Sequence, residues 1–439
     1  MKKLISVMLI LVMVLGIIGC SNDTASKDGA EETKKVSETK EKENTTKESK
    51  KLELTYALWD KNLQPIYEKI AIEFEKQNPE IDIVIEITPW SDYWTKLEAA
   101  ASGGVLPDIF WMNGPNITMY ADANVVLPIT EYVEDDQFDL SNYPQSLVDL
   151  YTVNGENYAI PIFWDTIALY YNKEIFDQAG VEYPTDSWTM EDLVQAATEL
   201  TNPDTGVYGI AAPLDNQQNY YNTIHQAGGY IISDDKKTSG FDDPATIKGI
   251  QVWVDMINQG ISPTLMELNE TNAASLFESG KLAMVYSGSW MYPQYAKNEN
   301  LAGKFDLEVL PMMEERASVI HGLGACINPA TDYPDEAWQF VKFLGSEEAN
   351  DIFAMEKGGL PAYLPSVNKF IDQESSTGYN VAVFTDQVSY SAMYPNSKHT
   401  SKWQAVERDY LKQAYTGEMT VEEACKKIAE EMNGILDKE

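Results

Sequence analysis

Aromatic rings and one carboxylate stand together in the segment 158–173, whose sequence is YAIPIFWDTIALYYNK. Phe163, Trp164 and Asp165 lie between two apolar, strand-like runs of this segment. An aromatic ring can stack on the C–H face of a pyranose, and a carboxylate accepts charge-assisted hydrogen bonds from sugar hydroxyls. The alternative is that Trp164 packs in the core and Asp165 caps a turn. The segment is therefore a candidate sugar site that the rest of the chain must support.

Tryptophans also follow three predicted strands in the first part of the folded chain. Alternating apolar residues and turn signals predict these strands at 52–58, 81–87 and 108–111. Predicted helices separate the strands, which favours a parallel α/β sheet. The tryptophans and their polar neighbours then share the C-terminal edge, where open α/β sheets bind ligands. The residues at this edge are Trp59, Asp60, Trp90, Trp111 and Asn113.

A fourth predicted strand repeats the pattern later in the chain. The apolar run 282–286 predicts this strand, and Gly280 ends the helix before it. Ser289 and Trp290 follow directly. Any one of these tryptophans could be a core residue, but four in equivalent positions favour a binding site.

The first residues indicate a targeting segment. Lys2 and Lys3 precede an apolar run at 4–18, which is too short and wrongly flanked for a stable membrane span. The run ends in Ile-Ile-Gly-Cys, which resembles the bacterial lipobox. We therefore expect a signal peptide at 1–19 and a lipid-bearing Cys20, because two acyl chains give stable membrane attachment. The alternative is an ordinary secretory signal with a chance cysteine.

A polar segment follows the expected lipid attachment site. Residues 21–50 contain one branched apolar residue and no aromatic residue, and their charges nearly cancel. This composition predicts a disordered tether that spans roughly 30 Å. Residues 20–50 would then hold a folded body outside the cytoplasm, anchored to the cell membrane.

The composition limits the partners and the chemistry. A formal net charge of -37 over 439 residues argues against nucleic acid, which is bound by clustered Lys and Arg, and against broad contact with anionic lipid. The length indicates two or more lobes. His225, His321 and His399 are widely spread, so we expect no metal site, and no cofactor motif is present. Cys326 and Cys425 lie far apart in the chain, and we expect two separate thiols.

The order of several short motifs resembles the extracellular solute-binding proteins of sugar ABC importers, the group that includes maltose-binding protein. Each motif is loose, but their order and spacing are specific, and they span nearly all of 52–439. The motifs are FEKQNPEIDI (74–83), KLEAAASGGVLPDIF (96–110), NGENYAIP (154–161), ALYYNKEIFDQAG (168–180), AGG (227–229), FESGKLAM (277–284) and PDEAWQFVKFL (334–344). The resemblance is weakest in the C-terminal tail.

This resemblance implies an α/β fold of two lobes, the type II periplasmic-binding-protein-like fold, with the ligand cleft between the lobes. Lobe 1 would contain 52–166 plus 322–361, and lobe 2 would contain 167–321 plus 362–439. The segment 158–173 then becomes a strand that crosses between the lobes. It would both contact the ligand and bend when the lobes close.

The resemblance also assigns ligand contacts. Asp165, six residues before Tyr171 of a Tyr-Asn-Lys motif, matches an acidic contact of the maltose-binding group, and Trp111, Trp290 and Trp403 match its aromatic platforms. Other positions depart from that group: Asn113 lies where a charged pair is usual, Gln217 begins a segment that replaces an acidic-aromatic contact, and Trp90 has no counterpart. The fold therefore transfers, but the exact sugar does not. The complete expected set is Trp59, Asp60, Trp90, Trp111, Asn113, Trp164, Asp165, Gln217, Ser289, Trp290 and Trp403.

These observations predict a non-catalytic, monomeric receptor that captures an oligosaccharide and delivers it to the membrane permease of an ABC importer. One alternative is a surface-anchored glycoside hydrolase that uses two of Asp60, Asp92 and Asp165 as acid and base. No nucleophile elbow, Walker loop or HExxH motif supports an enzyme. A second alternative is the same fold with a polyamine ligand, which the same acids and aromatics would bind.

Overall fold

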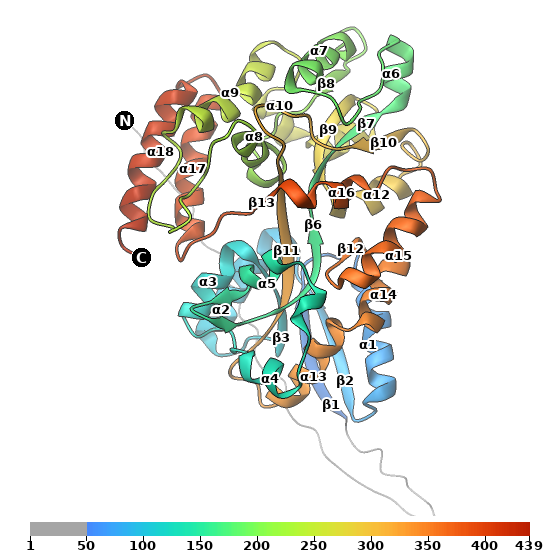
Figure 1. Cartoon of the computed structure of the whole chain (residues 1–439), viewed down its shortest axis with the longest axis vertical. Coiled ribbons are helices and arrows are strands. Elements are labelled where there is room, and N and C mark those ends of the chain that lie inside the picture. The colour runs from blue at the N-terminus through green and yellow to red at the C-terminus, as the bar shows by residue number, and fades with distance from the viewer. Residues whose placement is uncertain (1–50) are drawn as a thin grey trace, which may run out of the picture. The chain divides into compact units, whose positions relative to one another are not determined.

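The computed structural model describes residues 51–439, so the signal peptide, Cys20 and the tether lie outside the described residues. The described residues form two main β-sheets with helices packed around them (Figure 1). The larger sheet has the order β12-β6-β11-β3-β1-β2, with β13 paired to β11. Its strands are β1 (Leu52–Leu58), β2 (Ile81–Ile87), β3 (Ile109–Asn113), β6 (Ile160–Asp165), β11 (Ser318–Ile327), β12 (Leu360–Pro361) and β13 (Ser391–Met393).

The smaller sheet has the order β10-β7-β9-β8. Its strands are β7 (Ile167–Asn172), β8 (Tyr208–Ile210), β9 (Leu282–Gly288) and β10 (Phe305–Glu308), and a separate hairpin pairs β4 (Thr152–Val153) with β5 (Glu156–Asn157). The first half of the chain carries helices α1 (Gln64–Gln77), α2 (Trp90–Gly103), α3 (Gly114–Asp122), α4 (Thr130–Asp135), α5 (Gln145–Leu150), α6 (Lys173–Ala179), α7 (Met190–Leu200) and α8 (Tyr221–Gln226). The second half carries α9 (Pro244–Asn258), α10 (Leu265–Glu270), α11 (Ala273–Glu278), α12 (Tyr292–Lys297), α13 (Pro334–Leu344), α14 (Glu347–Met355), α15 (Leu364–Ser375), α16 (Val383–Asp386), α17 (Thr400–Tyr415) and α18 (Val421–Leu436).

The first three strands form the predicted parallel sheet. β1 pairs in parallel with both β2 and β3, and Figure 1 shows α1 and α2 on opposite faces of this sheet. The crossover β1-α1-β2 and the crossover β2-α2-β3 run in opposite directions across the sheet, and right-handed crossovers of opposite direction place their helices on opposite faces. Trp59 follows β1 and Trp90 opens α2, so both lie at the C-terminal edge of the sheet. Trp111 instead lies inside β3, where its side chain is fully buried.

Two adjacent strands carry the chain between the sheets. β6 and β11 run antiparallel and side by side through the middle of the structure (Figure 1). Only Thr166 separates β6 of the larger sheet from β7 of the smaller sheet. β11 pairs with β13 through Ile320 and with β6 from His321 onward. Both strands therefore change partners at the same level.

The expected interruption at Phe163, Trp164 and Asp165 is wrong, because β6 continues through all three residues. Trp164 pairs with Gly322, and Asp165 pairs with His321. Every residue of β6, β7 and β11 is buried. Strands that are covered on both faces have near-continuous apolar sequences, so the sequence pattern did not mark where β6 ends.

Local signals explain how two of the helices begin and end. Thr189 and Asp192 form a capping box at the start of α7: Thr189 Oγ1 accepts a hydrogen bond from Asp192 N, and the Asp192 carboxylate accepts one from Thr189 N at 2.8 Å. Gly104 ends α2 with a φ of 67°, in the left-handed region that favours glycine. These caps fix the ends of helices around each sheet.

The buried apolar residues form two clusters. The cluster that contains Cys326 surrounds the larger sheet and extends onto residues of β7, β9 and β10, and the cluster that contains Cys425 packs against other residues of the smaller sheet. Both thiols are free and buried, which confirms the expected separate thiols. Among residues 51–439, no helix is both long and apolar enough to cross a membrane.

A buried carboxyl group on α17 should make stability depend on pH. Glu407 is 0% exposed; its Oε2 accepts a hydrogen bond from the Tyr221 hydroxyl at 2.9 Å, and its Oε1 has no partner among the described residues. Burial raises the pKa of Glu407 from 4.5 to about 8. The folded state therefore keeps a proton that the unfolded state releases above about pH 4.5, so this contribution to stability is present at low pH and is lost as the pH rises toward 8.

We predict that Glu407→Gln removes this pH dependence, because the amide stays neutral. The free energy of unfolding of the variant, relative to the wild type, should rise between pH 5 and 8 with a slope of up to about 1.4 kcal/mol per pH unit. Urea unfolding at several pH values measures this difference. A difference that stays constant over that range would show that Glu407 is ionised in the folded protein.

Candidate functional site

A cleft of about 1390 Å³ lies between residues from both sheets. Pockets for drug-sized ligands measure about 300–1,000 Å³, so this cleft has room for a larger molecule. One wall comes from the β1–α1 loop, α2, β3 and β6. The opposite wall comes from residues 214–220, one face of α12 and one face of α17.

Four tryptophans line one side of the cleft: Trp59, Trp90, Trp94 and Trp111. The ring of Trp59 lies 5.1 Å from Trp90, 5.9 Å from Trp94 and 4.9 Å from Trp111, between ring centroids. Trp90 is 54% exposed, and Trp59 and Trp94 are partly buried. The contacts with Trp90 and Trp111 are edge-to-face and the contact with Trp94 is tilted, and both arrangements avoid the unfavourable face-to-face stack. Trp59, Trp90 and Trp94 therefore present a fixed apolar surface to the cleft.

Trp111 and Trp164 border the cleft, but their rings are buried beneath its surface and support the residues that face it. Trp111 is fully buried, and its Nε1 donates a hydrogen bond to the Tyr56 hydroxyl at 2.6 Å. Trp164 is 2% exposed, and its Nε1 donates to the Pro361 carbonyl at 3.0 Å. Neither ring has an open face in this structure. The expectation that both act as stacking platforms is therefore revised, because their rings pack against other side chains.

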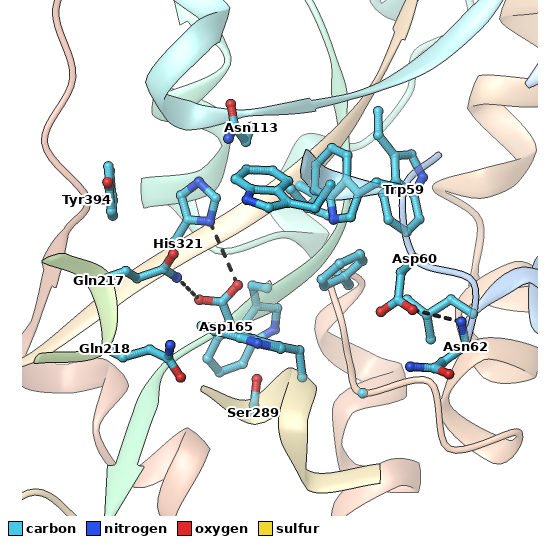
Figure 2. A pocket seen from close by; sticks show the side chains of 18 of the residues that line it. Trp59, Asp60, Asn62, Asn113, Asp165, Gln217, Gln218, Ser289, His321 and Tyr394 are labelled. Atoms are coloured by element: carbon cyan, nitrogen blue, oxygen red, sulfur yellow. Dashed lines mark hydrogen bonds and ion pairs between the residues drawn. The ribbon is translucent and has the colours of Figure 1, made fainter. Parts of the chain in front are cut away.

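Asp165 lies on the floor of the cleft, where Gln217 and His321 both point toward it (Figure 2). Gln217 Nε2 donates to Asp165 Oδ1 at 2.7 Å, and His321 Nδ1 lies 3.8 Å from Asp165 Oδ2. Burial raises the pKa of Asp165, and His321 and Gln217 partly offset this effect. The carboxylate can accept further hydrogen bonds from ligand hydroxyls, since a carboxylate has about four acceptor positions.

The turn that carries Gln217 is π-helical. This turn, η2 (Asn216–Tyr220), follows Asp215, whose Oδ1 accepts a hydrogen bond from Gln218 N at 2.7 Å. The Gln218 side-chain carbonyl accepts a hydrogen bond from Ser287 Oγ at 3.1 Å. π-Helical turns are rare in proteins, and those that occur are often found at functional sites. The α-helix that follows this turn, α8, begins at Tyr221.

Asp60 supplies a second carboxylate at the other end of the cleft, beside Asn62 (Figure 2). Its Oδ1 accepts a hydrogen bond from Asn62 N at 2.8 Å. Burial raises the pKa of Asp60, and bonds from the N–H groups of Asn62 and Leu63 offset part of this effect. The local turn thus fixes one oxygen of Asp60 in place.

Ser289 and Trp290 enter the cleft directly after β9. Ser289 N donates to the Thr166 carbonyl at 3.1 Å, which ties this turn to the residue between β6 and β7. A Cβ on Gly288 would lie 1.8 Å from the ring of Trp290, so only glycine allows the ring to pack there. Trp290 remains partly exposed to the cleft.

The structure brings nearly all of the expected ligand-binding side chains to this cleft. Those that line it are Trp59, Asp60, Trp90, Trp111, Asn113, Trp164, Asp165, Gln217, Ser289 and Trp290. Trp403 does not, and this expectation is wrong. Trp403 is fully buried, and its Nε1 donates to Ser397 Oγ at 2.9 Å. The face of α17 that lines the cleft carries Ser401, Gln404 and Arg408, and Trp403 points to another side of the helix.

Several lining residues were not predicted, among them Trp94, Gln218, His321, Tyr394 and Gln404. Trp94 had a usable signal, because it lies four residues after Trp90 on the same helix face. His321 and Tyr394 had none, because only the tertiary fold brings them to Asp165 and to each other. Residues 51–439 contain no group of three or more His, Cys, Asp or Glu side chains that could hold a metal ion.

The model of the family described as bacterial extracellular solute-binding protein matches residues 60–351. The maltotriose-binding protein of Pyrococcus abyssi is 26% identical over 359 residues, which cover 79% of this chain and 74% of that protein. The arabinooligosaccharide-binding protein of Halalkalibacterium halodurans is 25% identical over 301 residues, which cover 65% of this chain and 66% of that protein.

Solved structures share the fold. An ABC substrate-binding protein of Listeria monocytogenes, in complex with cycloalternan, superposes with a TM-score of 0.82 and 26% identity and covers 88% of this chain and 99% of that chain. The GacH receptor of Streptomyces glaucescens superposes with a TM-score of 0.79 and 22% identity and covers 88% of this chain and 99% of that chain. The described residues thus have the expected α/β fold of two lobes.

The supporting role of Trp111 gives a testable prediction. Trp111→Phe removes the N–H donor and leaves the buried Tyr56 hydroxyl without this partner, so we expect the free energy of unfolding to fall by about 1–3 kcal/mol. Urea unfolding measures the change. The matched control is Trp90→Phe, which should change stability by less than about 0.5 kcal/mol because Trp90 is largely exposed. Equal effects of the two substitutions would contradict the assignment.

Proposed function

Because the chain belongs to the bacterial extracellular solute-binding proteins, we propose that it captures an extracellular carbohydrate, most simply an oligosaccharide, for an ABC importer. The observation that carries the proposal is the contrast between the two walls of the cleft. Trp59, Trp90 and Trp94 form an aromatic wall, the side-chain amides of η2 lie on the opposite wall, and the Asp165 carboxylate lies on the floor between them. Sugars need both kinds of surface, because their C–H faces are apolar and their edges carry hydroxyl groups.

The size and polarity of the cleft support an oligosaccharide rather than a single sugar ring. A volume of about 1390 Å³ exceeds the usual range for drug-sized ligands. The relatives named for maltotriose and arabinooligosaccharides, and the structural neighbour that holds cycloalternan, agree with a ligand of several rings.

Capture would proceed by closure of two lobes. We assign 52–166 plus 322–361 to lobe 1 and 167–321 plus 362–439 to lobe 2. The direct passage from β6 to β7 and the change of partners along β11 at His321 support these boundaries. A ligand that contacts both walls binds the closed form more tightly than the open form and shifts the equilibrium toward closure. The closed form would then deliver the carbohydrate to the permease.

The attachment of the receptor to the membrane is proposed from its first residues. The basic residues, the apolar run and the Ile-Ile-Gly-Cys sequence support a signal peptide at 1–19 and lipid attachment at Cys20. Residues 21–50 would then tether a monomeric body outside the cytoplasm. Mass spectrometry of the protein from membrane fractions tests this assignment. We expect an acylated Cys20 at the N-terminus of the wild type and no acylation in Cys20→Ser.

We propose a receptor rather than a hydrolase. Three carboxylates of the cleft hold structural hydrogen bonds: Asp60 accepts one from the backbone N–H of Asn62, Asp165 accepts one from Gln217, and Asp215 caps η2. Incubation with labelled oligosaccharides should therefore release no product. Catalytic product formation would contradict a pure receptor.

Calorimetric titration with a panel of maltotriose, arabinooligosaccharides, lactose and monosaccharides tests the ligand class. We expect at least one oligosaccharide to bind. Trp90→Ala and Trp290→Ala should each weaken this binding by about 1–3 kcal/mol, a rise in Kd of about 5- to 150-fold, because each removes apolar contact area.

The control is Trp188→Ala, since Trp188 is partly buried beside Phe176 and does not line the cleft. It should leave the Kd unchanged. The carbohydrate assignment fails if no sugar of the panel binds, and binding of a polyamine such as spermidine instead would support the polyamine alternative. Unchanged affinity in both cleft variants would remove the two rings as ligand contacts.

A further inference from the structure

His321 occupies the level at which both crossing strands leave the larger sheet. It pairs with Asp165 in the register of β11 and β6. Residues before it on β11 pair with β13, and β6 ends at Asp165. The side chain is almost fully buried, at 6% residue exposure. The position of the His321 side chain therefore depends on how β6 and β11 lie relative to each other.

The hydrogen bonds of His321 define which ring nitrogen carries its proton. Gly114 N donates to His321 Nε2 at 3.1 Å. A nitrogen that accepts a hydrogen bond must keep its lone pair free, so the proton of the neutral ring lies on Nδ1. Nδ1 is the nitrogen that faces Asp165 Oδ2, at 3.8 Å. Figure 2 shows the imidazole directed at this carboxylate.

The other oxygen of Asp165 is already held. Gln217 Nε2 donates to Oδ1 at 2.7 Å. The side chain of Asp165 therefore lies between an amide donor from the smaller-sheet side and an imidazole donor on β11. The 3.8 Å separation on the His321 side is longer than a hydrogen bond, and a small rotation of either side chain would close it without changing the strand register that pairs the two residues.

The surroundings of His321 connect it to other elements of the cleft. Its ring packs edge-on against Tyr394 with centroids 5.2 Å apart, and Tyr394 N donates to the Ile320 carbonyl at 3.0 Å. The Gly114 carbonyl accepts a hydrogen bond from Asn396 Nδ2 at 3.1 Å. The backbone of Gly114 thus contacts both His321, through its N–H group, and the segment before α17, through its carbonyl.

From this geometry we propose that His321 is a positioning residue, whose Nδ1–H orients the Asp165 carboxylate so that it can accept hydroxyl groups of the bound carbohydrate as the lobes close. The proposal rests on the proposed function of the cleft. His321 acts through Asp165, and Gly114 N fixes the ring in the tautomer that this role requires.

The first test reads the tautomer without any ligand. The chain contains three histidines, so the full-length protein labelled with ¹⁵N-histidine gives few signals, and His225→Gln and His399→Gln identify the remaining one. At neutral pH we expect a protonated Nδ1 and an unprotonated Nε2 for His321. A proton on Nε2, or on both nitrogens, would overturn the proposal.

The second test compares two substitutions with maltotriose, or with whichever sugar of the panel binds the wild type. His321→Gln keeps an acceptor for Gly114 N and a donor for Asp165, whereas His321→Leu keeps neither. We expect His321→Leu to raise the Kd by at least about tenfold and His321→Gln to stay within about threefold of the wild type. Thermal unfolding of both variants shows whether they remain folded.

The control for general effects of a buried histidine is His225→Gln, since His225 is mostly buried but does not line the cleft. It should leave the Kd unchanged. Equal losses in His321→Leu and His321→Gln, or no loss in either, would overturn the positioning role. If the wild type binds no sugar of the panel, the proposed function fails and the positioning role falls with it, whereas a proton on Nε2 in a protein that does bind a sugar overturns the positioning role alone.

Discussion

The structure depends on one constraint: β6 and β11 must leave the larger sheet at the same level. Asp165 and His321 are paired across these strands at that level, and both are buried. A buried carboxylate is unfavourable unless donors surround it. Gln217, from the smaller-sheet side, donates a hydrogen bond to Asp165, and the His321 imidazole on β11 faces the other carboxylate oxygen at 3.8 Å, so the groups around Asp165 come from both halves of the cleft. The polar floor of the site and the connection between the lobes are therefore the same few residues.

The two walls of the cleft are stabilised in different ways. Contacts between rings hold the tryptophan wall, and Trp111 supports it from the core through its bond to Tyr56. Backbone geometry holds the opposite wall: Asp215 caps a π-helical turn, and Gly288 leaves space for Trp290. Rigid walls of this kind change little by themselves on binding, so the strands between them must carry the motion of closure.

Much of the fold could be predicted from the sequence, because β1, β2 and the helices between the first strands have clear periodicity and turn signals. The motif order also predicted the two-lobe fold. The site was predicted where local order decides it, as for Trp59 and Trp90 at the edge of the sheet. The positions of other side chains depend on tertiary packing and could not be predicted. Trp111 lies inside β3, and Trp403 faces the core while other residues of α17 line the cleft. His321 reaches Asp165 only because β11 pairs with β6. Strands buried on both faces, such as β6, have no alternation to show where they end.

The central claim is that a carbohydrate closes the cleft by contacting both of its walls. The distance between spin labels on Lys61→Cys and Lys297→Cys tests it most directly, because both exposed lysines line the cleft, one beside α1 and one at the end of α12. Cys20→Ser removes one other labelling site, and the native Cys326 and Cys425 are buried. The account predicts that a saturating oligosaccharide shifts the distance distribution to shorter values. A distribution that stays unchanged while the sugar is bound would contradict it.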